Sequence, residues 1–386
     1  MSALSVQTLL QNLPQWTAHC ASGAQPALRA IERCRTAALG YHLYACNRKG
    51  CGAEKMQYHS CRNRHCPNCG GARQQQWVEA RMRELIPCKY YHVVFTLPHS
   101  LNSLVMGNRK AMFNLLFQAA HDTLHTFGKD PRYLGAKAGI ISVLHTWGQN
   151  LSFHPHVHCI VSGGGIDAQG HWQESKKAKY GALYPVQAME KVYKGRFMHL
   201  LRRALAAEEL QTDQITDVPA LIKQLYAGRW VVFAKQPFGG PQQVIEYLGR
   251  YTHKVAISNQ RIKQIDADNR VSFDYKDYAD GNKTKRMTLE GTEFLRRFAQ
   301  HILPRGFCKI RSSGLYANHG RKTRITTLLE QLDVPQHPEP ASVPWHIRWM
   351  ERGGTNPLIC TCCKEGQMVL IRRTRTPAWG KEVLRE

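Results

Sequence analysis

Apolar residues along this chain fall into short runs that alternate with longer amphipathic stretches. Short runs rich in β-branched and aromatic residues predict strands at 90–97, 139–144, 154–161 and 230–235. Longer periodic stretches predict helices at 72–85, 104–127 and 191–207. Residues 261–278 alternate like a hairpin that turns at 266–269. This order predicts an α+β protein with a largely antiparallel central sheet.

One predicted strand carries histidines at alternate positions. His154, His156 and His158 lie in front of the apolar run 159–161, and the glycines at 163–165 end the strand. Side chains alternate between the two faces of a strand, so the three imidazoles point the same way. Neutral imidazole is a common metal ligand, and the pattern therefore predicts a metal site. The alternative is a row of hydrogen-bonded histidines without a metal.

A pair of tyrosines lies in the predicted helix at residues 242–253. Val244, Leu248 and Tyr251 fall on the apolar side of this helix. Tyr247 and Tyr251 are four positions apart, so they share one helical face. Taken alone, two such tyrosines are most often amphipathic core residues. Beside a histidine metal site in a very basic protein, they become candidate nucleophiles.

Cysteines concentrate between residues 34 and 69. Cys66 and Cys69 form a C-x-x-C knuckle, and Cys46 and Cys51 form a looser version of the same turn. Together these four thiolates would supply the tetrahedral set that zinc prefers in structural sites. Cys34, His42, Cys61 and His65 remain as further candidate ligands. They could form a second zinc site or be ordinary buried or surface residues, and the sequence favours neither interpretation.

Another C-x-x-C pair lies near the end of the chain, at Cys360 and Cys363. No second pair follows it, and Cys308 is distant. The sequence therefore gives only weak support for a further zinc site here.

Charge and composition narrow the class of partner. The chain has 386 residues and 43% hydrophobic residues, enough for two or three folded domains. With 53 Lys and Arg against 28 Asp and Glu, its net charge is +25, which indicates a polyanion partner such as nucleic acid. Neither a membrane-spanning run nor a signal-peptide pattern is evident, so we expect a cytoplasmic, nucleoid-associated protein. In that compartment, 13 cysteines indicate metal binding and not disulfides.

These features suggest four segments, with a proline-rich linker at 334–344 inside the last one. They are an N-terminal helical segment 1–33, a zinc-binding DNA-contact module 34–85, a nuclease domain 86–300, and a helical, basic C-terminal region 301–386 with a C-x-x-C tail.

Several of these motifs, taken in order, resemble those of a known protein family. They are residues 60–69 (SCRNRHCPNC), 95–98 (FTLP), 144–151 (LHTWGQNL), 154–158 (HPHVH) and 247–259 (YLGRYTHKVAISN). The chain is similar to rolling-circle insertion-sequence transposases of the insertion-sequence ninety-one group, within the histidine-hydrophobic-histidine (HUH) nucleases. The resemblance implies an HUH endonuclease domain around the central sheet, preceded by a zinc module.

The resemblance also implies a reaction. Family members nick one DNA strand with a tyrosine and stay joined to the 5′ phosphate, which makes them metal-dependent endonucleases and strand transferases. The family's histidine pair falls on His156 and His158, and its tyrosine pair falls on Tyr251 and Tyr247. The implied partners are single-stranded transposon ends and target DNA. The protein could act as a monomer or a dimer.

The expected cofactors are catalytic Mg²⁺ or Mn²⁺ and structural Zn²⁺. His156 and His158 would hold the catalytic ion with His154 as third ligand, although Gln149 and His145 are alternatives. Tyr251 is the first choice of nucleophile. The residues expected to contact DNA are Arg62, Arg64, Arg250, Lys254 and Arg261. For the last three, a structural role in solvating the surface is an equal alternative.

Three other functions remain open at this point. A plasmid-type replication initiator or relaxase would use the same chemistry at a different origin. A zinc-dependent DNA-binding protein would use the histidine strand only structurally. A transposase with three acidic residues is also conceivable, but no carboxylate constellation stands out in the sequence.

Overall fold

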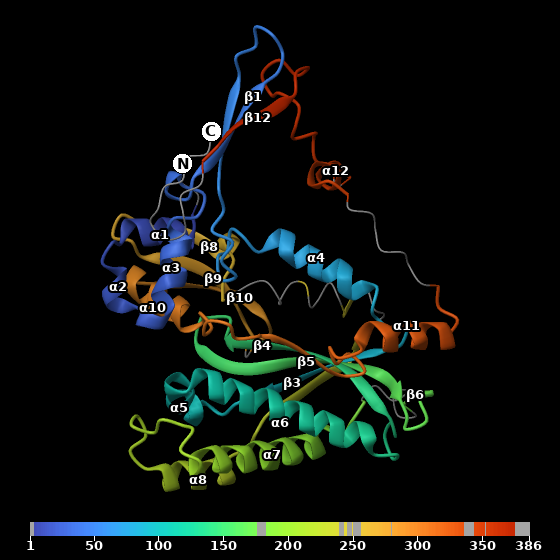
Figure 1. Cartoon of the computed structure of the whole chain (residues 1–386). Helices are drawn as coiled ribbons and strands as arrows, with labels where there is room; N and C mark the ends of the chain where they lie inside the picture. The colour runs from blue at the N-terminus through green and yellow to red at the C-terminus, as the bar shows by residue number, and fades with distance from the viewer. Residues whose placement is uncertain are drawn as a thin grey trace.

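A computed structural model describes residues 4–175, 183–238, 243–244, 249, 256–278, 280–335, 343–351 and 353–374. Among these residues, six strands form an antiparallel sheet at the centre of the molecule (Figure 1). Its order is β11-β4-β5-β3-β7, and β6 pairs with β5. The strands are β3 (Tyr90–Thr96), β4 (Lys137–Trp147), β5 (Phe153–Ile166), β6 (Trp172–Glu174), β7 (Val232–Phe238) and β11 (Ile310–Gly314).

Helices cover one face of this sheet (Figure 1). They are α5 (Asn102–Gly107), α6 (Arg109–Lys129), α7 (Val186–Ala206) and α8 (Val218–Ala227). Apolar residues recur every three or four positions along α6, so Phe113, Leu116 and Phe117 share one buried stripe. They pack in one cluster with Leu144 of β4 and Val157 of β5. Each such side chain contributes roughly 1.5–3 kcal/mol on burial.

The opposite face of the sheet is covered by α4 (Gly71–Met82) and α11 (Arg321–Gln331) (Figure 1). Ile141, Val143 and Ile160 point to this face and pack in a second cluster with residues of α11. Tyr90 and Tyr316 lie in the same cluster, and their hydroxyl oxygens are 2.6 Å apart. The histidines of β5 lie on this face.

The N-terminal helices α1 (Val6–Asn12), α2 (Trp16–His19) and α3 (Gln25–Glu32) share a third hydrophobic cluster with later elements. Their partners are β8 (Ile262–Ile265), β9 (Val271–Asp277), β10 (Lys283–Leu289) and α10 (Gly291–Gln300). Leu9 and Leu28 pack there with Phe273 and Phe294. Short 3-10 turns occur at Ser22–Ala24, Ala37–Leu39, His99–Leu101 and Asn259–Arg261.

A three-stranded sheet projects from the molecule and forms what we call the arm (Figure 1). It consists of β1 (Tyr41–Cys46), β2 (Glu54–Tyr58) and β12 (Met368–Arg373), in the order β12-β1-β2. The last described strand therefore pairs with the first one, antiparallel. A short helix, α12 (Trp345–Met350), precedes β12.

The predicted α+β class and antiparallel sheet are confirmed, as are a cysteine-rich N-terminal module and helices in the C-terminal region. Packing crosses two of the predicted segment boundaries. The boundary at residue 300 excludes β11, which hydrogen-bonds to β4 at the edge of the central sheet. The segment 1–33 is not separate either, because it shares its core with residues 256–302. The predicted linker 334–344 lies mostly outside the described residues.

Gly314 offers a test of the packing of β11 on the sheet. It has a φ of +63°, and a Cβ there would lie 1.8 Å from the carbonyl oxygen of Ala138. Gly306 has a similar φ of +72° but nothing within 4 Å of its Cβ position. We expect Gly306→Ala to lower the free energy of unfolding by about 1–2 kcal/mol through the backbone alone. Gly314→Ala should cost about 1–3 kcal/mol more, because the carbonyl must move. Urea denaturation would measure both, and equal losses would contradict the close packing.

Candidate metal centres and nucleic-acid site

Three histidines converge on one face of the central sheet. The pairing of β4 with β5 sets His145 directly opposite His156, and Val143 opposite His158. Residues opposite each other in an antiparallel pair point to the same face, so His145, His156 and His158 form one group. Their ring nitrogens lie within 4.8 Å of one another. This group can hold a divalent ion with three nitrogen ligands and leave positions for substrate or water.

Neighbouring groups orient two of these rings. The Nδ1–H of His156 donates to the carbonyl oxygen of His154 at 2.6 Å, which leaves its Nε2 lone pair for a metal. Nδ1 of His158 lies 2.8 Å from Nε2 of His92 on β3. Burial lowers the pKa of His156 to about 4, so its ring is neutral and able to ligate near pH 7.

The predicted third ligand lies beside this group and outside the set of three. The ring centroid of His154 is 5.1 Å from that of His156 and 5.1 Å from that of His99, but its nitrogens are not among those that lie within 4.8 Å of one another. Gln149 donates its side-chain amide to the hydroxyl of Tyr278. Of the two alternatives named from the sequence, His145 is the residue that the sheet brings to His156 and His158. Its position results from pairing between neighbouring strands, which spacing within β5 does not reveal.

Most of the predicted tyrosine helix, residues 242–253, lies outside the described residues. Tyr247, Tyr251, Arg250 and Lys254 are among the residues not described. The residues that flank them are placed. Val244 is fully buried in the cluster that includes Ile160, and a Cβ on Gly249 would lie 2.7 Å from Val78 of α4.

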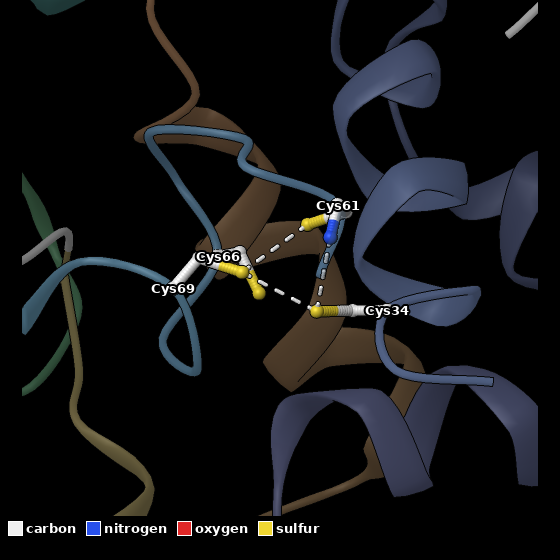
Figure 2. A group of neighbouring side chains, drawn as sticks. All are labelled: Cys34, Cys61, Cys66 and Cys69. Carbon is white, nitrogen blue, oxygen red and sulfur yellow. Dashed lines mark hydrogen bonds between the residues drawn. The ribbon is translucent and has the colours of Figure 1, made fainter. Parts of the chain in front are cut away.

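Four cysteines meet between α3 and the loop before α4. Figure 2 shows Cys34, Cys61, Cys66 and Cys69 with their sulfurs turned toward one another. The Sγ of Cys69 lies 3.3 Å from that of Cys34 and 3.7 Å from that of Cys61. Four sulfurs at about 2.3 Å from one zinc ion are about 3.8 Å apart, so the group fits a structural zinc. The cysteine-rich module is thus present, and its thiols are grouped differently from the predicted set.

A second group of four cysteines lies at the end of the arm. Cys46 and Cys51 come from the β1–β2 hairpin, and Cys360 and Cys363 come from the turn before β12. The predicted set of Cys46, Cys51, Cys66 and Cys69 is therefore divided between the two groups. The hairpin carries its two cysteines away from the Cys66 knuckle, and each pair finds partners elsewhere. Short spacings identify each pair locally but do not determine which pairs share an ion.

The two histidines of the predicted second zinc set have other contacts. His65 accepts a hydrogen bond from the backbone N–H of Leu303 at its Nε2, with 3.0 Å between the nitrogens. Burial, with Arg64 next among the causes, lowers the pKa of His65 to about 3, so the ring remains a neutral acceptor. His42 packs against His59, with ring centroids 4.6 Å apart. Only the two cysteines of that set, Cys34 and Cys61, enter a four-thiol group.

Two arginines that we expected to contact DNA hold backbone carbonyls. Arg64 donates to the carbonyl oxygens of Pro304 and Phe307. Arg261 donates to those of Asp274 and Gln149. These guanidinium groups therefore connect separate segments of the chain. Arg62 is exposed and has a φ of +53°. Among the described residues, no helix combines the length and apolar composition that a membrane span needs.

An α+β fold with thiol groups suited to zinc, a histidine group on its sheet and a net charge of +25 is typical of a metalloprotein that handles nucleic acid. Comparison with known families agrees. Residues 6–97 match the family model described as "Transposase zinc-binding domain", and residues 139–324 match the one described as "Putative transposase".

Two relatives extend the match over most of the chain. A protein named "Putative transposase y4qJ" from Sinorhizobium fredii (strain NBRC 101917 / NGR234) is 42% identical over 357 residues, 89% of this chain and 88% of the relative. The "Transposase for insertion sequence element IS801" from Pseudomonas savastanoi pv. phaseolicola is 32% identical over 298 residues, 74% and 68% of the two chains. The chain belongs to the IS91 family of insertion-sequence transposases, which confirms the resemblance noted above.

Solved structures of the conjugative relaxase TrwC with oriT DNA give weaker matches. A metal-free form is 14% identical over 42% of this chain and 71% of the relaxase chain, with a TM-score of 0.23. A metal-bound form is 12% identical over 59% and 93% of the two chains, with a TM-score of 0.24. With TM-scores this low, the fold is described from the strands and helices of this chain alone.

The first thiol group predicts a specific effect on zinc content. We expect Cys34→Ser to remove the zinc ion bound by Cys61, Cys66 and Cys69, since a serine hydroxyl does not replace a thiolate at a structural site. Cys20→Ala is the control, because Cys20 is also buried but belongs to neither thiol group. Metal analysis of the purified protein measures the difference. Equal zinc in both variants would rule out this ligand set.

Proposed function

We propose that this protein nicks and rejoins single-stranded DNA at the ends of its insertion sequence, through a 5′-phosphotyrosine intermediate, in rolling-circle-type transposition. The observation that carries this proposal is the histidine group on the central sheet. This group lies on the same face of the sheet as buried Val244. Val244 precedes Tyr247 by three positions in the sequence. Membership in a transposase family supports a DNA substrate.

The histidine group suits a divalent ion, Mg²⁺ or Mn²⁺, which when bound would polarise a non-bridging oxygen of the scissile phosphate. His156, His158 and His145 are the ligands that we assign. The hydrogen bond from His156 to the His154 carbonyl fixes which nitrogen of His156 faces the ion. In this assignment His145 and not His154 is the third ligand. The backbone carbonyl of His154 orients the ring of His156.

We assign the nucleophile to Tyr251. Its phenolate oxygen would attack phosphorus while the bond to the 3′ oxygen breaks, and the 3′ oxygen would take up a proton. The phosphate stays joined to the 5′ side of the break and to the tyrosine. A phosphodiester bond is exchanged for another, so rejoining needs no ATP. A free phenol has a pKa of about 10 and needs activation at the moment of attack. Tyr247 would make the second cut.

The arm is the surface that we assign to DNA contact, with Arg62 nearby in the zinc module. Its exposed cations are Arg48, Lys49, Lys55, Lys364, Arg372 and Arg373, whereas its exposed acidic residues are Glu54 and Glu365. Cations in such excess neutralise backbone phosphates and release counterions. Arg64 and Arg261 are not part of this surface, because their guanidinium groups hold carbonyls. Arg250 and Lys254 remain candidates beside the tyrosines.

The choice of His145 as third ligand can be tested by metal titration. We expect His145→Ala to raise the Mn²⁺ concentration for half-maximal cleavage at least about tenfold, the lower end of the cost of losing even an outer-shell partner. His154→Ala should have little effect, because the backbone carbonyl that orients His156 is retained. The reverse order would return His154 to the ligand set.

Covalent attachment tests the reaction itself. Purified protein would be incubated with Mn²⁺ or Mg²⁺ and a labelled single strand from the end of the element. We expect a protein–DNA adduct on the 5′ phosphate, which Tyr251→Phe abolishes. His156→Ala should lower its rate about 100-fold, the order expected when one electrostatic group on the reacting phosphate is lost.

Tyr226→Phe provides the matched control for this assay. Tyr226 is 47% exposed on α8, on the helical face opposite the histidines, so the adduct should form at the normal rate. DNA binding without any cut or adduct, in either metal, would show instead a DNA-binding protein without catalysis.

A further inference from the structure

We propose that Cys46, Cys51, Cys360 and Cys363 form a second zinc site, and that this zinc fastens the C-terminal segment 353–374 to the N-terminal hairpin. The site joins residues more than 300 positions apart in the sequence. The matched zinc-binding domain, residues 6–97, contains only half of its ligands. The proposal concerns how the arm is assembled and does not depend on the nuclease reaction.

Sulfur geometry is the first support for this site. The Sγ atoms of Cys46 and Cys363 are 3.7 Å apart, and those of Cys51 and Cys360 are 3.8 Å apart. Sulfurs bound to one zinc ion lie about 3.8 Å apart, whereas disulfide sulfurs lie about 2.05 Å apart. All four sulfurs lie within 4.8 Å of one another, so one ion can reach them all.

The backbone around the cysteines forms two facing turns. In the first, the N–H of Arg48 points at the Sγ of Cys46, at 3.4 Å. In the second, the N–H of Gly366 points at the Sγ of Cys363, at 3.2 Å. N–H groups directed at sulfur stabilise the thiolate form that binds metal. Each turn therefore prepares a thiolate for the shared ion.

Gly366 shows how closely the two turns approach each other. A Cβ at this position would lie 2.3 Å from the Sγ of Cys46, in the opposite turn. Beside it, Asn47 and Gln367 exchange two hydrogen bonds, at 2.9 and 2.7 Å. The C-terminal turn thus rests directly on the sulfur of the N-terminal one, with no room for a side chain between them.

The arm has too little buried surface to hold β12 without help. Every residue of β2 is exposed, and in β12 only Met368 is buried. Leu370 and Ile371 are 51% and 52% exposed. Small sheets without a packed face are marginal in water, and small domains of this kind rely on metals or disulfides. Binding of a structural zinc supplies folding free energy directly. Zinc would thus be a clasp that fastens the turn before β12 to the β1–β2 hairpin, in the arm where β12 lies beside β1 (Figure 1).

Metal content of the full-length protein tests the site. We expect about two zinc ions per chain, one for each four-thiolate set, and about one in the double variant Cys360→Ser/Cys363→Ser. Cys362→Ser is the matched control, because Cys362 lies between the two ligands but is exposed and outside the group. It should retain both ions. A single ion in the wild type, or no loss in the double variant, would overturn the proposal.

Hydrogen exchange tests the clasp separately from the ion count. In the double variant, we expect backbone amides of residues 368–373 to exchange roughly tenfold faster or more, while those of β4 and β5 are unchanged. Gly366→Ala keeps all four thiols and should raise exchange in the same strand, since its Cβ would strike the Cys46 sulfur. Unchanged protection of β12 in both variants would show that its pairing with β1 does not need the metal.

Discussion

The pairing of β4 with β5 is the interaction on which the histidine site depends. Its register brings His145 opposite His156. On the other face of the same two strands, Leu144 and Val157 are buried against the helices that cover the sheet. A slip of one residue would turn these apolar side chains to the histidine face, and their packing against the helices would be lost. Hydrophobic burial on one face of the sheet therefore holds three imidazoles together on the other.

The two thiol groups differ in how much hydrophobic packing surrounds them. Cys34 and Cys66 are buried beside the core formed by the N-terminal helices, so the first group adds to packing that already exists. The second group lies on the arm, where both faces of the sheet are largely exposed. There we infer that the metal takes the place of a core. His65 links the first group to the loop before β11 through its bond to Leu303.

Local patterns in the sequence were sufficient for most of the elements and insufficient for their partners. Alternation at 154–161 and the three-four spacing in α6 predicted a strand and a helix correctly, because both depend on neighbouring residues. Cys66 and Cys69 were recognisable as a ligand pair for the same reason. The sequence did not reveal which cysteine pairs lie together, since Cys363 reaches Cys46 only through the return of the chain. The carbonyls held by Arg64 and Arg261 also belong to other segments, 13 to 243 positions away in the sequence.

The sequence by itself determined the class of fold, the face of β5 that carries the histidines, the local cysteine pairs and the transposase family. These follow from short-range periodicity, from spacing and from ordered motifs. Only the tertiary structure decided that His145 joins His156 and His158, that eight of the 13 cysteines form two groups of four, and that β12 completes the arm. Such groupings depend on strand pairing and on the return of the chain, which spans more than 300 positions for the second thiol group. These groupings are stabilised by burial of apolar surface across the whole molecule, so no local sequence pattern predicts them.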